Sequence, residues 1–334
     1  MKKLLVTGGA GFIGSNFARM MLGKYPDYHI TVLDALTYAG NLENLEDLRD
    51  DPRFSFVKGD IRSKEDVEGP VAECDVIINF AAESFVDRSI LEPDSFITTD
   101  VLGTHILLEA ARKRGIEKFV HISTDEVYGD VEVGSSKETD SFAPNSPYSA
   151  SKASADLMVL AYYKTYGLPV TVTRGSNTYG PYQHPEKLIP LFISNAMDDK
   201  PLPVYGDGQQ VRDWLHVLDH CSGVDIALHN GKIGHAYNVG GGNERTNLEI
   251  TKLILKYTGK SESLMKYVTD RPGHDRRYSL DCSKLKSIGW QPQVPFEDGL
   301  RETAEWYMQN QEWWRRVKEG REYQRFNEEW YTKR

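Results

Sequence analysis

The sequence predicts an α/β protein, in which a Rossmann-type, doubly wound parallel sheet is joined to a smaller mixed α/β C-terminal substrate lobe. Three observations predict it. Apolar runs of strand length alternate with helical patterns through the first half of the chain, a glycine-rich turn follows the first run, and Pro- and Gly-rich segments interrupt the second half. Strands that are apolar along their whole length are typical of a parallel sheet with helices on both faces.

The first half of the chain supplies the elements of this sheet in turn. Short apolar runs predict strands at residues 4–7, 30–33, 54–57, 76–80, 119–123 and 170–173. Apolar residues at helical spacing lie between them, at residues 12–21, 106–111 and 151–166. This alternation of strand and helix is the order in which a parallel sheet is built.

Beyond residue 176 the alternation gives way to short elements separated by Pro and Gly. We expect a Rossmann domain over residues 1–176, to which roughly residues 211–238 return, and a smaller lobe with C-terminal helices over residues 177–334. The final segment, residues 312–334, is rich in Trp, Arg and Glu, and we expect a surface helix packed by its aromatic side chains.

The composition disfavours several kinds of partner. The 334 residues carry a formal net charge of −9, whereas nucleic-acid backbones select basic surfaces. No apolar run approaches the length that crosses a bilayer. The three cysteines, Cys74, Cys221 and Cys282, are scattered and odd in number, so we expect neither a disulfide framework nor a metal site. We therefore expect a cytoplasmic protein with a small-molecule substrate and no nucleic-acid or membrane partner.

A glycine-rich turn follows the first predicted strand. Gly8, Gly11 and Gly14 have the spacing G-x-x-G-x-x-G, which lets the backbone approach a pyrophosphate at the helix N-terminus. Asp34 ends the second strand 20 residues after Gly14 (34 − 14), where a carboxylate binds the adenosine ribose and repels a 2′-phosphate. The pattern indicates a site for NAD rather than NADP, although a tight turn without a ligand has the same local features.

A tyrosine and a lysine are spaced to share one helix face. Tyr148 and Lys152 stand at i and i+4. Lowering the pKa of a tyrosine from about 10 to about 7 needs roughly 4 kcal/mol. A lysine about 5 Å away supplies roughly 3 kcal/mol at an effective dielectric of about 20. An oxidised nicotinamide could supply the rest, so the pair would act as a base only with oxidised cofactor bound.

Two adjacent carboxylates, Asp125 and Glu126, follow the fifth predicted strand within HISTDEVYGD. Like charges at the end of a buried strand repel one another and add nothing to a core. The segment is either an acidic surface loop or a pair of acid and base groups held over a substrate, and its residues alone leave both interpretations open.

Segments spread over nearly the whole chain match the sequence pattern of one known family. They include TGGAGFIGSN, AAESFVDRSI, HISTDEVYGD, PNSPYSASKASAD, YNVGGGNE and RPGHDRRY. In these segments the sequence resembles the extended short-chain dehydrogenase/reductases and, within them, the dTDP-glucose 4,6-dehydratases. The specific part is STDEVYG, because related 4-epimerases lack the Asp-Glu pair after Ser/Thr. The resemblance implies conversion of dTDP-glucose to dTDP-4-keto-6-deoxyglucose and water, in the biosynthesis of deoxysugars such as rhamnose.

The resemblance also implies a role for each catalytic residue. Tyr148, supported by Lys152, would take the proton of the hydroxyl on sugar carbon 4 while NAD takes the hydride. Glu126 would then remove the proton on carbon 5, and Asp125 would protonate the departing hydroxyl of carbon 6. Thr124 would hydrogen-bond the oxygen on carbon 4, and the hydride would return to carbon 6.

Further contacts follow from the resemblance alone. Those expected with the cofactor, beyond the glycine-rich turn, are Phe12, Ile13, Asp34, Thr37, Asp60, Ile61, Ala81, Ala82, Thr99, Tyr148, Lys152 and Asn177. Those expected with the nucleotide sugar are Ser84, Thr124, Asn177, Glu186, Lys187, Leu188, Pro203, Tyr205, Arg212, Asn247, Arg271 and His274. The family pattern also implies a homodimer.

The chain departs from the family pattern at Phe85, where a histidine is usual, and this puts the rate or its pH dependence in doubt. Other NAD-retaining enzymes remain alternatives: a 4,6-dehydratase of UDP-glucose, a 4-epimerase or a UDP-glucuronate decarboxylase. Thymine and uracil differ by one methyl group, worth about 1 kcal/mol, and no residue visibly reads it. A non-catalytic nucleotide-sugar sensor would lack Tyr148, Lys152 or the acids, all of which are present.

Overall fold

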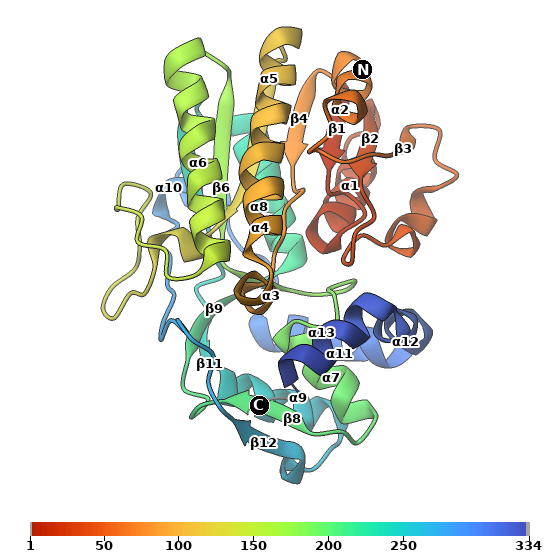
Figure 1. Cartoon of the computed structure of the whole chain (residues 1–334), viewed down its shortest axis with the longest axis vertical. Helices are drawn as coiled ribbons and strands as arrows, with labels where there is room; N and C mark the ends of the chain where they lie inside the picture. The colour runs from red at the N-terminus through yellow and green to blue at the C-terminus, as the bar shows by residue number, and fades with distance from the viewer. Residues whose placement is uncertain (1, 332–334) are drawn as a thin grey trace.

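A computed structural model, which describes residues 2–331, confirms the α/β class (Figure 1). Among these residues, seven parallel strands form the larger sheet in the order β10-β6-β5-β4-β1-β2-β3. Their bounds are Lys2–Thr7 (β1), Tyr28–Asp34 (β2), Phe54–Lys58 (β3), Val76–Asn79 (β4), Lys118–Thr124 (β5), Val170–Gly175 (β6) and His235–Val239 (β10). The six strands predicted from the first half of the sequence are all present.

Helices cover both faces of this sheet because its strands are apolar on both sides. In β1, Leu4 and Val6 pack on one face and Leu5 packs on the other. The first face carries α1 (Phe12–Lys24) and α8 (Val217–Asn230), and the second carries α2 (Lys64–Ala72), α5 (Thr104–Arg114) and α6 (Pro147–Tyr166). In Figure 1 α5 and α6 stand in front of the strands.

The smaller lobe is built from short strands and helices. One sheet has the order β11-β9-β7, and the other pairs β12 with β8 in parallel. The strands are Asn177–Tyr179 (β7), Leu202–Tyr205 (β8), Val211–His216 (β9), Glu244–Thr246 (β11) and Met265–Val268 (β12). The helices are Leu188–Met197 (α7), Asn247–Thr258 (α9), Glu262–Leu264 (η4) and Phe296–Gln309 (α11), whereas Ser283–Lys286 (α10) packs on β10 and α8 of the larger domain.

Short elements link the two parts at the carboxyl edge of the sheet. They are Leu42–Leu48 (η1), Val86–Leu91 (α3), Pro93–Phe96 (α4), the π-helix Ile97–Gly103 (η2) and Asp125–Tyr128 (η3). Residues 217–239 add α8 and β10 to the larger sheet, whereas β9 pairs with β7 and β11. The division of the chain at residue 176 stays a prediction.

The C-terminal segment forms two helices rather than the one expected. They are α12 (Gln311–Glu319) and α13 (Arg321–Tyr331), and the expectation for residues 332–334 lies outside the described residues. Their aromatic side chains are buried as expected, among them Trp314, Phe326 and Trp330. The break falls at Gly320, whose extended backbone ends α12.

The long helix α6 begins four residues earlier than the apolar pattern indicated. Pro147 is its first residue, and Ser146 and Ser149 form a reciprocal capping box at its N-terminus. Proline is well suited to this position because its fixed φ matches the helix and its missing N–H would have no helical partner. The early start puts Tyr148 inside the first turn, so Tyr148 and Lys152 belong to the same helix.

Candidate active site

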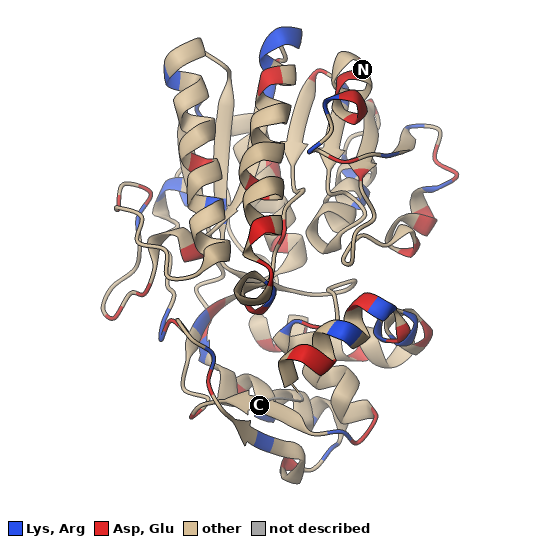
Figure 2. Ribbon diagram, in the orientation of Figure 1, with Lys and Arg blue, Asp and Glu red and all other residues tan. Residues whose placement is uncertain are grey.

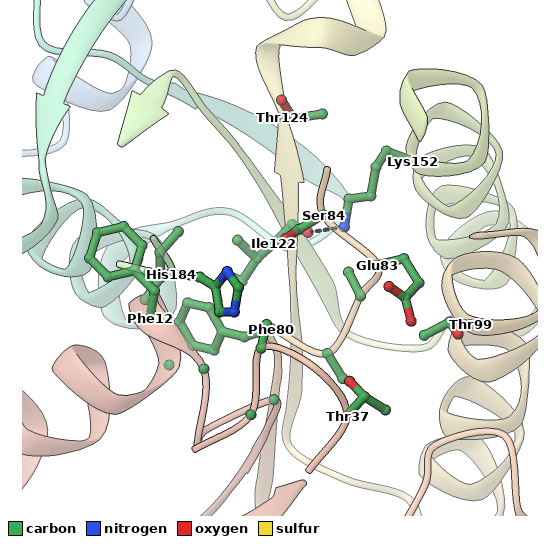
Figure 3. Close-up of a pocket in the computed structure, with 18 of the residues that line it drawn as sticks. Phe12, Thr37, Phe80, Glu83, Ser84, Thr99, Ile122, Thr124, Lys152 and His184 are labelled. Carbon is green, nitrogen blue, oxygen red and sulfur yellow. Dashed lines mark hydrogen bonds between the residues drawn. The ribbon is translucent and has the colours of Figure 1, made fainter. Parts of the chain in front are cut away.

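A cavity of about 300 Å³ lies at the carboxyl ends of the parallel strands, and a second cavity of about 140 Å³ adjoins it. The strand order reverses between β1 and β4, and open parallel sheets bind their ligands at such a point. The two cavities share wall residues, including Ser84, Glu126, Asn177 and Lys187. Figure 3 shows part of the walls, with side chains that come from both the sheet and the smaller lobe.

The glycine-rich turn is packed so tightly that side chains cannot replace its hydrogens. Gly8 has a φ of +68°, and a Cβ atom there would lie 2.5 Å from the backbone nitrogen of Ala81. A Cβ atom on Gly14 would lie 2.4 Å from the carbonyl oxygen of Gly8. The turn therefore forms a bare backbone cradle at the N-terminus of α1, which is the arrangement that accommodates a pyrophosphate.

Asp34 closes the other side of this cradle. Its Oδ2 accepts from the backbone N–H of Ala10 and its Oδ1 from that of Leu36, at 2.9 and 2.8 Å. Burial raises the pKa of Asp34, and these two backbone hydrogen bonds counteract the rise. Each carboxylate oxygen can accept more than one hydrogen bond, so Asp34 can also accept hydrogen bonds from the hydroxyls of a ribose. The cradle and the carboxylate thus fit the adenosine diphosphate half of NAD.

Lys152 projects from α6 toward the end of β5. Its Nζ is buried and donates to the carbonyl oxygen of Ile122 at 2.7 Å (Figure 3). Next to it, Ser151 donates to Oδ2 of Asp100 at 2.5 Å, and the backbone N–H of Glu83 donates to Oδ1 at 2.8 Å. Burial lowers the pKa of Lys152, while Asp100 and Asp156 oppose that change.

Tyr148 does not have a lowered pKa from the protein groups around it. Burial raises the pKa of its phenol well above the usual value, and the negative charges of Glu126 and Asp100 add to the rise, while a hydrogen bond with Thr124 opposes it. The lysine at i+4, expected to supply most of the lowering, points to Ile122. The positive charge needed to make Tyr148 a base therefore has to come largely from a ligand.

Thr124, Asp125 and Glu126 lie at the junction of β5 and η3. Thr124 caps the turn by accepting from the backbone N–H of Glu126 at 3.3 Å, and its hydroxyl donates to Oδ1 of Asp125 at 3.1 Å. Asp125 is only 3% exposed, and its Oδ2 has no hydrogen-bond partner among the described residues. The acidic pair is therefore not a solvated surface loop, because both residues face into the first cavity.

The two carboxyls differ in their electrostatic surroundings. Burial raises the pKa of Asp125 well above its usual range, and the charges of Glu126 and Asp213 raise it further. The pKa of Glu126 is also raised overall by burial, but the cationic side chains of Arg271, Arg212 and Lys187 counteract the rise. The cationic side chains therefore favour ionisation of Glu126, whereas nearby negative charges disfavour ionisation of Asp125, an arrangement that suits a proton donor beside a proton acceptor.

The second cavity combines buried cations with apolar walls. Arg271 donates to Oδ1 of Asp87 at 2.7 Å, and Arg212 donates to the carbonyl oxygen of Asp275 at 3.0 Å. Lys187 donates to the carbonyl oxygen of Ser84. These three cations suit a diphosphate, since a buried anion needs charged partners in a site of low dielectric.

The structure brings all of the sequence-predicted site residues to the walls of these two cavities. The expected cofactor contacts and catalytic residues line the first cavity. The expected nucleotide-sugar contacts line the second cavity or the junction, except for Thr124, which lines only the first. Several polar atoms in the walls are buried without a partner among residues 2–331, namely Asn177 Oδ1, Glu186 Oε1, Asn247 Oδ1 and Arg271 Nε. The individual contacts and roles stay predictions.

Phe85, the departure from the family pattern, does not face solvent. Its ring packs 5.5 Å from that of Phe326 in α13, and Nζ of Lys187 lies 4.5 Å from its centroid. A phenyl ring in this place carries no titratable proton and contributes an apolar surface to the second cavity.

Sequence reasoning missed Glu83, Asp100 and Tyr331. Glu83 lines the first cavity, pointing toward Thr99 in Figure 3, and burial raises its pKa to about 7. Glu83 was predictable from the sequence, because it lies between Ala82 and Ser84, which are both expected site residues. Asp100 had the same kind of signal, because it directly follows Thr99, whereas no expected site residue lies near Tyr331 in the sequence.

Residues 2–331 contain neither a candidate metal site nor a candidate membrane-spanning helix. No cluster of three or more His, Cys, Asp or Glu within that range is arranged to hold a metal ion. No helix that the structure describes is long and apolar enough to span a membrane.

This chain is similar to known nucleotide-sugar enzymes over most of its length. A model of the GDP-mannose 4,6 dehydratase family matches residues 5–303. A dTDP-glucose 4,6-dehydratase of Actinoplanes is 51% identical over 93% of this chain and 99% of its own length. The crystal structure of DesIV, the dTDP-glucose 4,6-dehydratase of Streptomyces venezuelae with NAD and TYD bound, has a TM-score of 0.93 and 51% identity, covering 94% of this chain and 99% of that one. A UDP-glucose 4-epimerase of Thermus thermophilus with NAD has a TM-score of 0.86 and 33% identity, over 92% and 99%.

Proposed function

The chain belongs to the extended short-chain dehydrogenase/reductases, among the proteins of the GDP-mannose 4,6 dehydratase family, and from this we infer that it is a dTDP-glucose 4,6-dehydratase. It is an NAD-dependent lyase that converts dTDP-glucose to dTDP-4-keto-6-deoxyglucose and water. When bound, NAD accepts the hydride from sugar carbon 4 and returns it to carbon 6, so no reduced cofactor is left after a turnover.

We propose that Tyr148 is the base of the first step. Its Oη takes the proton of the hydroxyl on carbon 4, and Thr124 hydrogen-bonds the same oxygen. Burial raises the pKa of Tyr148, so this role depends on the positive charge of the oxidised nicotinamide. Lys152 orients the ligand and adds positive charge from the same helix face.

Glu126 and Asp125 divide the elimination between them. Glu126 takes the proton from carbon 5, which the ketone on carbon 4 has made acidic, and Asp125 gives its proton to the hydroxyl that leaves carbon 6 as water. The support for this assignment is the difference in environment: cations counteract the rise in the pKa of Glu126, whereas the charges of Glu126 and Asp213 add to the effect of burial and raise the pKa of Asp125 further. Each such proton transfer contributes about 10²–10⁴-fold to the rate.

One observation carries the proposal: two adjacent carboxyls of unlike pKa face the cavity that Tyr148 and Lys152 also line. Oxidation at carbon 4 alone needs only a tyrosine and a cofactor, while loss of water needs a further base and a further acid. A 4-epimerase has no use for that second pair.

The test is an assay of products with dTDP-glucose and with UDP-glucose. We expect dTDP-glucose to give a 4-keto-6-deoxy sugar without accumulation of reduced cofactor, and UDP-glucose to be the poorer substrate. A 4-epimerised hexose, or no turnover of either sugar, would overturn the proposal. Faster turnover of UDP-glucose than of dTDP-glucose would support the proposed reaction but would change the nucleotide of the proposed substrate from dTDP to UDP.

We further propose a homodimer, formed through helices of the larger domain. Large apolar side chains are exposed on η2 and α6, where Ile97, Leu102 and Leu157 are 52%, 47% and 60% exposed. Figure 2 shows few charged residues along the middle of α6. A Leu157→Glu variant should sediment as a monomer if this face is the interface, and a dimer in that variant would contradict the assignment.

We propose that the protein is located in the reducing cytoplasm. We also propose that its product is used in the synthesis of a deoxysugar such as rhamnose. The support for the compartment is that Cys74, Cys221 and Cys282 are all buried and unpaired. Thiol titration of the native and the unfolded protein checks this, since disulfide-bonded protein from cells would contradict it.

A further inference from the structure

The helix α13 stands outside the part of the chain that the family model matches, yet it reaches the substrate cavity. The match ends at residue 303, and α13 spans Arg321–Tyr331. Tyr331 is one of the residues that line the second cavity. Figure 1 places α13 below the larger sheet and below α3, next to α11 and α12.

Two aromatic contacts hold α13 against the walls of that cavity. Phe326 packs on Phe85, with ring centroids 5.5 Å apart, and lies 4.6 Å from the guanidinium carbon of Arg88. Arg88 in turn donates to Glu186 at 2.8 Å. The helix therefore packs on Phe85 at the wall of the cavity and is connected through Arg88 to Glu186, which also lines it.

A chain of hydrogen bonds runs from α13 to a cation of the site. Trp330 donates from Nε1 to the hydroxyl of Tyr205 at 2.6 Å, and that hydroxyl donates to Oδ2 of Asp87 at 3.0 Å. The other oxygen of Asp87 accepts from Arg271 at 2.7 Å. Asp87 is 1% exposed and Trp330 is 3% exposed, so water competes little with these bonds.

The position of Tyr331 indicates which part of a ligand it meets. The two cavities join at Glu126, Asn177 and Lys187, and the reacting sugar has to lie there to reach Glu126 and Tyr148. Tyr205 and Tyr331 line only the second cavity, beyond this junction, with their rings nearly parallel at 14° and 6.5 Å between centroids. The end of the ligand opposite the sugar is the nucleoside.

We propose that α13 completes the nucleotide-sugar site: Tyr331 contacts the nucleoside, and Trp330 is a positioning residue that acts through Tyr205 and Asp87 on Arg271. This inference rests on the proposed function for the identity of the ligand. The hydroxyl of Tyr331 bonds to Tyr205, so Tyr331 offers mainly its ring face, which suits the apolar face of a base or ribose. Trp330 acts through Tyr205 to hold the Asp87 carboxylate in place, and Asp87 orients the guanidinium group of Arg271.

The experiment compares Trp330→Phe and Tyr331→Ala with the wild type in kcat and KM for dTDP-glucose, and in the Kd of dTDP by calorimetry. Each variant should raise KM and Kd roughly threefold to tenfold, the effect of one lost hydrogen bond or ring contact, and leave kcat within about twofold. Trp314→Phe is the matched control, because Trp314 is equally buried and donates to the carbonyl oxygen of Tyr307, away from both cavities.

A double-mutant cycle tests the route through Tyr205. If Trp330 acts through Tyr205, then Trp330→Phe should add nothing to the KM effect of Tyr205→Phe; fully additive effects would overturn the positioning role. Tyr331→Phe retains the ring and should recover most of the affinity lost in Tyr331→Ala. Melting temperatures identify any variant that is only unstable.

The outcomes also separate this inference from the proposed function. Wild-type protein that converts dTDP-glucose, with unchanged KM and Kd in both α13 variants, would overturn the role of α13 alone. An equal rise in KM in Trp314→Phe would overturn it as well, since the effect would then reflect helix packing. Wild-type protein that binds dTDP but does not convert dTDP-glucose would refute the function, while the Kd values would still decide the role of α13.

Discussion

Replacing Glu126 by glutamine should stop the reaction after oxidation at sugar carbon 4. Glutamine has the shape of glutamate but cannot accept the proton from carbon 5. The turn itself should persist, because the bond that shapes it runs from the backbone N–H of Glu126 to Thr124. The variant therefore separates the chemistry of the carboxylate from the fold around it.

The magnitude follows from the role of the carboxylate. A general base contributes about 10²–10⁴-fold, or roughly 3–5 kcal/mol of the barrier, so dehydration should slow by that factor. Oxidation should respond differently. The negative charge of Glu126 is among the causes that raise the pKa of Tyr148, second only to burial. Without it the pKa of Tyr148 falls, and the pH profile of oxidation should move to lower pH.

The assay follows both half-reactions in one sample. Reduced cofactor, seen by its near-ultraviolet absorbance, should accumulate in Glu126→Gln with dTDP-glucose, and nuclear magnetic resonance in heavy water should show the carbon 5 proton retained. In Asp125→Asn, the matched control, that proton should exchange while loss of the hydroxyl slows. Normal dehydration by Glu126→Gln, or loss of oxidation together with dehydration, would refute the assignment of the base.

Two further predictions concern buried charge. Burial raises the pKa of Asp100 from 3.8 to about 6, so the folded protein holds this proton more tightly than the unfolded chain. The contribution of protonated Asp100 to the free energy of unfolding is complete below about pH 4. It is lost as the pH rises through about 6, which lowers that free energy by roughly 3 kcal/mol. Urea unfolding of Asp100→Asn should lack this part of the pH dependence. Arg174 donates to Asp156 at 2.7 Å, with both side chains buried, so Arg174→Met should lower the free energy of unfolding by about 3–5 kcal/mol. Arg301→Met, at the exposed pair with Asp298, should lower it by about 1 kcal/mol or less. Equal losses in the two arginine variants would show that burial of the pair is not the cause.

Much of the larger domain was predictable because its signals are local. The apolar run of each strand and the spacing of Tyr148 and Lys152 are properties of a few consecutive residues. The errors are local too: the first turn of α6 carries Pro147 and Ser149 rather than an apolar stripe, so its start was placed late. The single helix expected at the C-terminus is two, because one glycine at position 320 is a weak signal for a break.

The sequence by itself determined the sheet, the cradle of the glycine-rich turn and the presence of an acidic pair, since each depends on residue type and short spacing. Only the tertiary structure shows that the two carboxyls of the pair have different electrostatic surroundings. That difference depends on Arg212 and Arg271, far along the chain, and on burial that closes around Asp125. The same holds for α13, because Trp330 meets Tyr205 across 125 residues and no local pattern records a contact of that separation.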